Sequence, residues 1–335
     1  MNTHRSRPAT PLHTTAPSDR LTTKEKIRRA ISLADFGVEN MHIDEVPDVS
    51  AAAGEVLIAT AAATINPADA DMVSGAMAAV LPRAITAPYT PGWDLAGHIV
   101  GVGDGADASL VGSRVVGFSP WFEAGRGTQA SLVALPMANV AVAPDNDIPS
   151  AQLTTIGLNG LTAWRAIDEL APAEGETLVI AGAGGSVGGF ALELAVARGA
   201  RVIAAVGERD RAEVLALGAT DVVVREAGDV GATVRAILPQ GADAFLDTTR
   251  TLGASALGAV RDGGRYVTTN TAPESERDIT VTAIHGAPNA AALATLIEMA
   301  AAGLLHTPVA REFDVADARA LTRNSLRAPT AAGSS

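Results

Sequence analysis

The residues with the clearest chemistry form a glycine-rich segment, Gly182–Gly188, directly after the apolar run Thr177–Ala181. Small residues recur there as Ala183-x-Gly185-x-x-Gly188, a variant of the dinucleotide-binding pattern. They permit a tight turn, a close approach of the backbone to a pyrophosphate, and close helix–strand packing. A helix that starts here offers free N–H groups to phosphates. The predicted phosphate-binding residues are Gly182, Ala183, Gly184, Gly185, Ser186, Val187 and Gly188.

The end of the next apolar run, Arg201–Val206, indicates which dinucleotide is bound. An acid at this place usually takes a free ribose 2′-hydroxyl, whereas an arginine takes a 2′-phosphate. The small Gly207 leaves room for a phosphate, and Arg209 or Arg211 could bind it through charge-assisted hydrogen bonds. Glu208 is the counter-argument, because its carboxylate could take the hydroxyls instead. We predict NADPH, with Gly207 and Arg209 at the phosphate.

The elements that position this turn alternate between strands and helices from about residue 149 onward. Continuous apolar strands that alternate with helices predict a parallel sheet covered on both faces, a doubly wound α/β fold. Ligands bind at the carboxyl edge of such a sheet. Asp247, Thr248, Thr269 and Asn270 follow the fourth and fifth strands and are predicted to line the cofactor site. The expected strands are 177–181, 201–206, 221–224, 244–247 and 265–269, with helices at 187–198 and 209–217.

The preceding part of the chain has a different rhythm. Short β-branched runs at 54–59, 97–103 and 112–117, separated by Gly and Pro, predict an antiparallel barrel or sandwich. We therefore expect a β-rich domain over 25–148 and a dinucleotide-binding domain over 149–285. Residues 286–335 are expected to pack back on the first domain, and residues 1–24 to form a disordered tail.

Composition excludes several classes of function. The 335 residues carry a formal net charge of −12, which repels nucleic-acid backbones. No Cys occurs, which removes disulfides, thiolate nucleophiles and thiolate metal sites. No apolar run is long enough to span a membrane, and the apolar segment 290–305 predicts an ordinary helix. We expect a cytoplasmic protein that binds neither nucleic acid nor membrane.

Together, these patterns resemble the medium-chain dehydrogenase/reductase superfamily, in particular its zinc-free quinone oxidoreductase-like branch. The likeness covers residues from about 26 to 320. It implies a GroES-like β-rich catalytic domain, a Rossmann cofactor domain and a homodimer joined edge to edge, for which 278–283 is the candidate strand. The stretches that carry it are 54–58, Ile65–Asp69, Pro91–Gly97, Gly160–Trp164, the glycine turn and Asp262–Tyr266.

The resemblance also implies the chemistry. Zinc enzymes of the superfamily have Gly-His-Glu where this chain has Gly92-Trp93-Asp94, and their zinc-binding Cys falls near Leu158. Without imidazole or thiolate, Lewis-acid activation of an alcohol is not available. The implied reaction is hydride transfer from NADPH to a quinone or an α,β-unsaturated carbonyl in an inter-domain cleft.

Candidate site residues follow from the matching motifs. Asn66 corresponds to a polar residue near the nicotinamide, where its amide would hold an acceptor carbonyl, although turn chemistry before Pro67 explains it equally well. Thr162 corresponds to a position on the phosphate–ribose side, or only starts a helix. Asp94 corresponds to an acid beside the cleft, or only caps backbone N–H groups. Tyr89 is a candidate proton donor, although a tyrosine on such a loop usually packs.

Two departures from the superfamily leave the function open. Many relatives have Lys where this chain has Asp71, a charge that would oppose an anionic product. Relatives also end in a strand that returns to the first domain, whereas this chain ends without one, so that edge is either open or covered by another segment. The alternatives are an enoyl reductase or tailoring oxidoreductase of a biosynthetic pathway, and a catalytically silent NADPH-binding sensor or structural protein.

Overall fold

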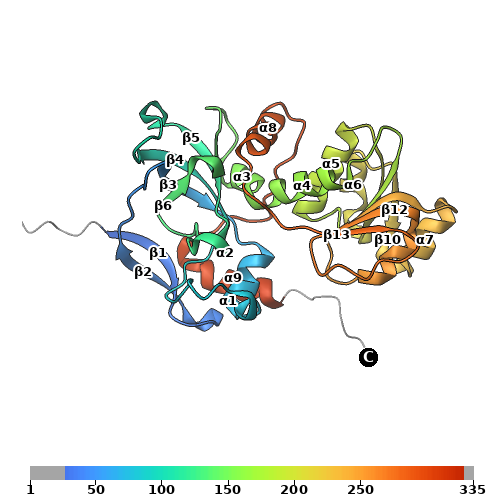
Figure 1. The fold of residues 1–335 in the computed structure, drawn as a ribbon, viewed down its shortest axis with the longest axis horizontal. Coiled ribbons are helices and arrows are strands. Elements are labelled where there is room, and N and C mark those ends of the chain that lie inside the picture. The colour runs from blue at the N-terminus through green and yellow to red at the C-terminus, as the bar shows by residue number, and fades with distance from the viewer. Residues whose placement is uncertain (1–26, 328–335) are drawn as a thin grey trace, which may run out of the picture.

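The computed structural model describes residues 27–327, which form two lobes, each built around one sheet (Figure 1). One lobe holds a curled antiparallel sheet and the other holds a parallel sheet flanked by helices. The mixed α/β class expected from the sequence is therefore confirmed. The tail predicted for residues 1–24 lies outside the described residues.

The antiparallel lobe begins with a hairpin and continues into a five-stranded sheet of order β6-β3-β4-β5-β7. Alternating apolar side chains, among them Val56, Ile58 and Leu95, are buried on its inner face. The segment before β6 is extended by β1, through a bridge between Ala30 and Ala130. The strands are β1 (Ile27–Leu33), β2 (Met41–Pro47), β3 (Glu55–Ala63), β4 (Asp94–Val102), β5 (Arg114–Phe118), β6 (Leu132–Pro136) and β7 (Val140–Val142).

The parallel lobe has six strands in the order β10-β9-β8-β11-β12-β13. The first two strands along the chain are almost wholly buried, as their continuous apolar sequence requires. The strand order reverses between β8 and β11, and ligands of open parallel sheets bind at such a point. The strands are β8 (Thr177–Ala181), β9 (Arg201–Val206), β10 (Asp221–Val224), β11 (Ala242–Asp247), β12 (Val260–Thr268) and β13 (Thr280–Ala283), and the helices are α5 (Ser186–Ala197), α6 (Arg211–Ala216) and α7 (Val230–Ile237).

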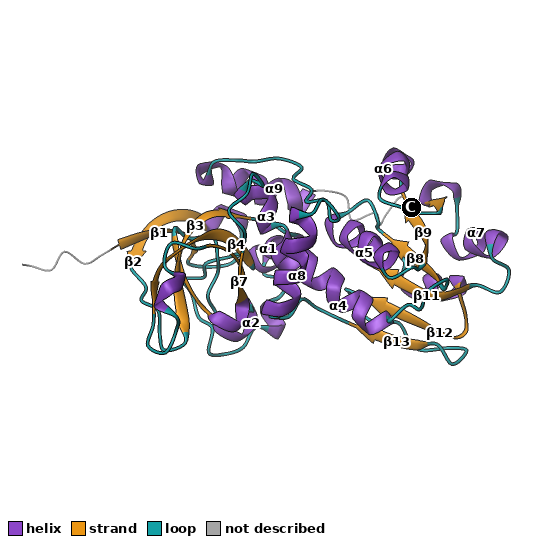
Figure 2. Cartoon of the chain, turned by 90° about the horizontal axis from the view of Figure 1, so that it is seen from above, coloured by secondary structure: helices purple, strands orange, loops and turns teal. Residues whose placement is uncertain are grey.

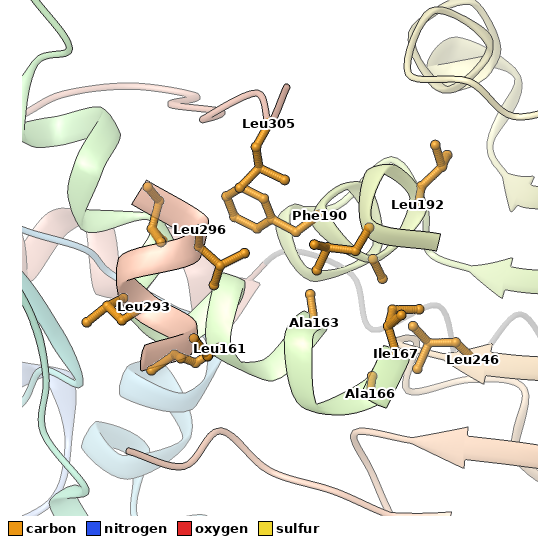
Figure 3. Packing of buried hydrophobic residues seen from close by; sticks show 14 of the residues in the cluster. Leu161, Ala163, Ala166, Ile167, Phe190, Leu192, Leu246, Leu293, Leu296 and Leu305 are labelled. Atoms are coloured by element: carbon orange, nitrogen blue, oxygen red, sulfur yellow. The ribbon is translucent and has the colours of Figure 1, made fainter. Parts of the chain in front are cut away.

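Helices fill the region between the two sheets (Figure 2). A single continuous segment contains α3 (Ser150–Thr154), a π-helical turn at Ile156–Gly160, and α4 (Leu161–Leu170). The helix α8 (Ala290–Ala301) packs against this segment and against β7. Figure 3 shows Leu161, Leu296 and Phe190 meeting in one apolar cluster, so the two lobes share a core.

Three helices of the first lobe and the C-terminal part were not anticipated: α1 (Pro67–Ser74), α2 (Trp121–Ala124) and α9 (Ala318–Arg327). Of these, α9 packs on α1, and the described part of the chain ends as a helix, where the resemblance to the superfamily implies a strand. The predicted helix over 290–305 is present as α8 and stops at Ala301. No helix among residues 27–327 is long and apolar enough to cross a membrane.

Candidate active site

The glycine turn sits between β8 and α5, at the point where the strand order reverses. Gly182 has a φ of +82°, a left-handed conformation that favours glycine. A Cβ atom at Gly188 would lie 2.2 Å from the carbonyl oxygen of Gly182, so no side chain fits there. Gly184 and Gly185 are exposed, and the first N–H groups of α5 have no partner within the helix. This geometry fits a dinucleotide pyrophosphate.

The ribose corner, which we define as residues 207–211 after β9, holds paired charges. Arg209 binds Asp210 at 3.0 Å and its side chain is 88% exposed. Arg211 binds Glu208 at 2.9 Å, so the carboxylate that argued against a phosphate is engaged by an arginine. The Asp210 carboxylate itself reaches back to the turn, 2.7 Å from the Cβ that Gly184 would carry.

Space at Gly207 is bordered by charges from the neighbouring strand as well. A Cβ on Gly207 would lie 3.1 Å from Glu226 Oε1 and 3.6 Å from Arg225 Nη2. Arg225, which follows β10, is exposed and was not among the predicted residues. Arg225 is far from the glycine turn in the sequence, so only the strand order β10-β9-β8 indicates that it lies near the ribose corner.

The residues predicted at the ends of β11 and β12 lie together. The hydroxyl of Thr248 donates to the Ala181 carbonyl at 2.8 Å and would contact any Cβ on Gly182. The Thr269 N–H donates to the Asp247 carbonyl at 3.1 Å, while the Asn270 amide donates to the Thr249 carbonyl. These contacts bring the strand ends to the glycine turn.

Asp247 itself acts as a brace within the protein. One carboxylate oxygen accepts from the N–H and the hydroxyl of Thr249 at 2.8 and 2.7 Å. The other accepts from the buried Tyr266 hydroxyl at 2.9 Å. Burial, followed by the nearby Asp247 charge, raises the pKa of Tyr266 above its ordinary value. Both carboxylate oxygens are thus bound to protein groups, which gives Asp247 a role in holding the loop after β11.

A buried polar network lies where the two lobes meet, centred on Asp94, which is fully buried at the start of β4. Its carboxylate accepts from both the N–H and the hydroxyl of Thr64, and from the Leu158 N–H at 3.0 Å. Asn66 Nδ2 is a fourth donor, at 3.5 Å. Burial raises the pKa of Asp94, while the hydrogen bonds from Thr64, Leu158 and Asn66 lower it and so oppose the rise.

Asn66 is held firmly inside this network. Its side-chain nitrogen donates to Thr64 Oγ1 at 2.6 Å as well as to Asp94, and its oxygen accepts from Asn159 Nδ2 at 3.0 Å. An amide nitrogen carries two hydrogens, and both are used here. The Asn66 amide is therefore not free to hold an acceptor carbonyl in this arrangement.

Asn159 reaches the network from the π-helical turn, 93 positions along the chain. Gly157 makes this approach possible, because a Cβ there would lie 2.4 Å from the Asp94 Cβ. Asn159 is 8% exposed, and within the described residues its side chain hydrogen-bonds only to Asn66. Isolated π-helical turns occur often at functional sites. The sequence offers no periodicity that indicates this turn, and Asn159 was not predicted.

Asp69 is a second buried acid, one turn into α1. Its Oδ2 accepts from the Asn66 N–H at 2.7 Å, and its Oδ1 has no hydrogen-bond partner among the described residues. Burial raises the pKa of Asp69 to about 8, and the negative charge of Asp94 adds to the rise. Burial thus favours the protonated form of Asp69, and its Oδ2 fixes the backbone at Asn66. The motif Ile65–Asp69 contains it, but spacing alone did not mark it as a site residue.

The last two predicted residues lie in different settings. The Thr162 hydroxyl donates to the Leu158 carbonyl at 2.7 Å, a contact within its own helix segment. Tyr89 stacks on Phe36 with ring centroids 5.1 Å apart and lies 6.2 Å from Trp121. Within residues 27–327, the Tyr89 hydroxyl makes no hydrogen bond to the Asp94 network. Roles for Thr162 at the cofactor and Tyr89 as a proton donor stay predictions.

Tyr89 belongs to an aromatic cluster beside the network. Trp93, the residue before Asp94, lies 6.3 Å from Trp121 and 5.3 Å from Phe122. Tyr89 and Phe122 are partly exposed, and Trp93 and Trp121 are buried. The cluster, defined as Phe36, Tyr89, Trp93, Trp121 and Phe122, gathers nearly half of the six Phe, three Trp and two Tyr of the chain. Over the described part of the chain, no group of three or more His, Cys, Asp or Glu is arranged to hold a metal ion.

Comparison with known proteins agrees with this architecture. The family described as the alcohol dehydrogenase GroES-like domain matches residues 52–145, and the zinc-binding dehydrogenase family matches residues 186–296. The chain belongs to the medium-chain dehydrogenase/reductase superfamily. The predicted resemblance to this superfamily is thereby confirmed.

Individual relatives carry the word quinone in their names. A quinone oxidoreductase of Rattus norvegicus is 33% identical over 207 residues, which is 60% of this chain and 60% of the relative. A chloroplastic quinone-oxidoreductase homolog of Spinacia oleracea is 29% identical over 208 residues, 59% of this chain and 61% of the relative. The chain thus matches about three-fifths of the length of these superfamily members. The solved quinone oxidoreductase of Coxiella burnetii shares the fold, with a TM-score of 0.79, 20% identity, and coverage of 90% and 96% of the two chains.

Proposed function

We propose that this protein is a zinc-independent oxidoreductase that transfers hydride from NADPH to the conjugated carbonyl of a quinone or an enone. The glycine turn carries the proposal, because Gly182 and Gly188 leave no room for side chains while Gly184 and Gly185 are open to a ligand. The names of the rat and spinach relatives support a quinone as acceptor. When bound, the reduced nicotinamide supplies the hydride.

The charged side chains at the ribose corner favour NADPH over NADH. Arg209 is exposed and can turn from Asp210 toward a 2′-phosphate, and Arg225 borders the space at Gly207 from the next strand. Glu208 is held by Arg211, which leaves it less available for ribose hydroxyls. Charge-assisted bonds from a guanidinium to a phosphate contribute about 1.5–3 kcal/mol each. The Asp210 carboxylate at Gly184 opposes this preference, so Arg209 and Arg225 together must outweigh it.

The acceptor is proposed to bind beside the Asp94 network. Asn159 is the group assigned to the acceptor oxygen, because both amide hydrogens of Asn66 are used, whereas the Asn159 amide donates one hydrogen to Asn66 and has a second one. An N–H directed at that oxygen stabilises the negative charge that develops during reduction. The aromatic cluster beside Asp94 suits a planar ring, since aromatic faces pack well on one another.

Zinc independence rests on the donors at this position. Trp93 and Leu158 stand where zinc relatives have imidazole and thiolate ligands, and neither side chain can coordinate a metal. The Asp94 carboxylate accepts hydrogen bonds from four protein donors, so it is already saturated. These residues do not fit a zinc ion.

We further propose a homodimer formed through β13. This strand is the last of the parallel sheet and, within residues 27–327, pairs only with β12. Its outer edge presents unpaired backbone groups that an identical strand can satisfy. Sedimentation of the wild-type protein at micromolar concentration tests this, and a monomer there rules the dimer out.

A fluorescence titration with NADPH and, separately, with NADH tests the cofactor assignment. Tight binding of NADPH with clearly weaker NADH supports the proposal, whereas equal binding contradicts the role given to Arg209. Failure to bind either dinucleotide rejects the proposal. No activity is needed for this measurement, so it separates a silent dinucleotide-binding protein from one that has lost the site.

Oxidation of NADPH over a panel of quinones, enones and enoyl thioesters then tests the reaction. Fastest turnover with quinones supports the proposal, and a preference for enoyl thioesters favours the enoyl reductase instead. Binding without any turnover favours the silent protein. Asn159→Ala should lower kcat with quinones about 10-fold or more while NADPH affinity stays unchanged, because the lost contact forms in the transition state. Asn139→Ala, at a buried amide on a different turn, is the matched control.

A further inference from the structure

Asp71 and Arg250 form an ion pair that joins the two lobes. Asp71 lies on α1, and Arg250 lies 179 positions later on the loop that follows β11. Arg250 Nη1 donates to Asp71 Oδ1 at 3.0 Å while Nη2 donates to Oδ2, so the pair is bidentate. Within residues 27–327, no other ion pair links residues 27–148 to residues 149–285.

Each partner of this pair stands on a rigid support. The loop that carries Arg250 is fixed by Asp247, which binds Thr249, and by Asn270, which binds the Thr249 carbonyl. Two residues before Arg250, Thr248 contacts the first residue of the glycine turn. A movement of Arg250 therefore displaces a loop that is tied directly to the dinucleotide site.

Asp71 is connected to the other half of the site in the same way. It lies five positions after Asn66 on α1, whose first turn is fixed by the bond from the Asn66 N–H to Asp69. The pair thus connects the element that starts at the Asp94 network with the loop beside the glycine turn. Arg250 also neutralises Asp71, the acid that stands where many relatives have Lys, and Asp71 raises the pKa of Arg250.

We propose that the Asp71–Arg250 pair is a clasp between the lobes that must open for the dinucleotide to enter and to leave. The inference rests on the proposed function, since the gated ligand is the proposed cofactor. A bidentate guanidinium–carboxylate pair has one well-defined geometry, so it suits a closed state. Because the side chains are 44% and 22% exposed, solvent can compete for them and the clasp can open readily.

Stopped-flow fluorescence of NADPH binding tests the clasp without any turnover. Asp71→Asn and Arg250→Gln should each raise both the association and the dissociation rate about two- to five-fold, as loss of a partly exposed pair allows, with little change in Kd. The double variant should show no more than the larger single effect, and the exchanged pair D71R/R250D should return toward the wild-type rates. Asp221→Asn, which breaks the similarly exposed pair to Arg201 within the parallel lobe, is the control.

Hydrogen exchange provides an arm that needs no cofactor. Without ligand, Asp71→Asn should speed amide exchange in α1 and in residues 248–252, and D221N should leave both segments unchanged. Unaltered NADPH rates and unaltered exchange in Asp71→Asn, or additive effects of the two single variants, would overturn the clasp. If the wild-type protein binds neither dinucleotide, the proposed function and the gating role are overturned together. If it binds NADPH but the substitutions leave the binding rates unchanged, only the gating role is overturned.

Discussion

The two ends of the candidate site are built in opposite ways. At the Asp94 network, a fully buried carboxylate accepts hydrogen bonds from residues 28 to 64 positions away along the chain. At the ribose corner, exposed charges pair with neighbours one and three positions away, Arg209 with Asp210 and Arg211 with Glu208. The buried end is fixed by the tertiary fold, whereas the exposed end can rearrange around a ligand. The acceptor side should therefore tolerate substitution poorly, and the cofactor side should tolerate it well.

Among substitutions compared at one neutral pH, Asp94→Ala should produce the largest effect, because it leaves four donors without their buried acceptor. We expect the free energy of unfolding to fall by about 3 kcal/mol, because a buried donor left without an acceptor costs about 1–3 kcal/mol. Urea denaturation measures this. Asp168→Ala, at an acid whose side chain is 72% exposed, should change stability by less than about 1 kcal/mol. If the two variants lose the same stability, the claim that the buried end tolerates substitution less well than exposed positions is wrong.

Asp69 should make the stability of the buried end of the site depend on pH. Its pKa of about 8 in the folded protein exceeds the ordinary value of 3.8, so between these values the folded state binds more protons than the unfolded state. Stability should therefore fall as pH rises through this window, by at most about 1.4 kcal/mol per pH unit. Asp69→Asn keeps an acceptor for the Asn66 N–H and removes this dependence.

Urea unfolding at about pH 5 and about pH 8 measures how the free energy of unfolding changes with pH in the wild type and in Asp69→Asn. The variant should gain stability relative to wild type on going to the higher pH. Asp44→Asn, at an exposed acid on β2, should follow the wild-type slope. Parallel curves for Asp69→Asn and wild type would show that Asp69 is ionised in the folded protein.

The same contrast explains which features could be predicted from the sequence. The fold class follows from local patterns: the apolar runs of β8 and β9, the change of rhythm near residue 150, and the glycine turn between a strand and a helix. Each of these depends on residues within about a dozen positions, where spacing directly constrains geometry. The confirmed fold and superfamily rest on such signals.

The network and the clasp depend on long-range contacts that spacing does not encode. Asn159 meets Asn66 only because a π-helical turn with Gly157 approaches β4. From the sequence alone, Asp71 is expected to oppose an anionic product. Nothing in the sequence indicates that Arg250, in the other lobe, neutralises its charge. Predicting either contact requires the relative placement of the two sheets, which packing of α4 and α8 determines.

The smallest expected effect lies at the exposed end. Arg209→Gln should weaken NADPH binding about 10-fold, equivalent to about 1.4 kcal/mol, because the 2′-phosphate loses one charge-assisted partner. Stability should not change, since the Arg209 side chain is 88% exposed and, among the residues that the structure describes, pairs only with its neighbour Asp210. Parallel titrations with NADPH and NADH measure the effect, and NADH affinity should be unaltered.

Arg211→Gln is the matched control on the same turn. Arg211 holds Glu208, so its loss should free that carboxylate for the ribose hydroxyls and improve NADH binding, whereas Arg209→Gln should weaken NADPH binding alone. If Arg209→Gln weakens both dinucleotides equally, the arginine serves a group that they share, and the 2′-phosphate must be assigned to Arg225.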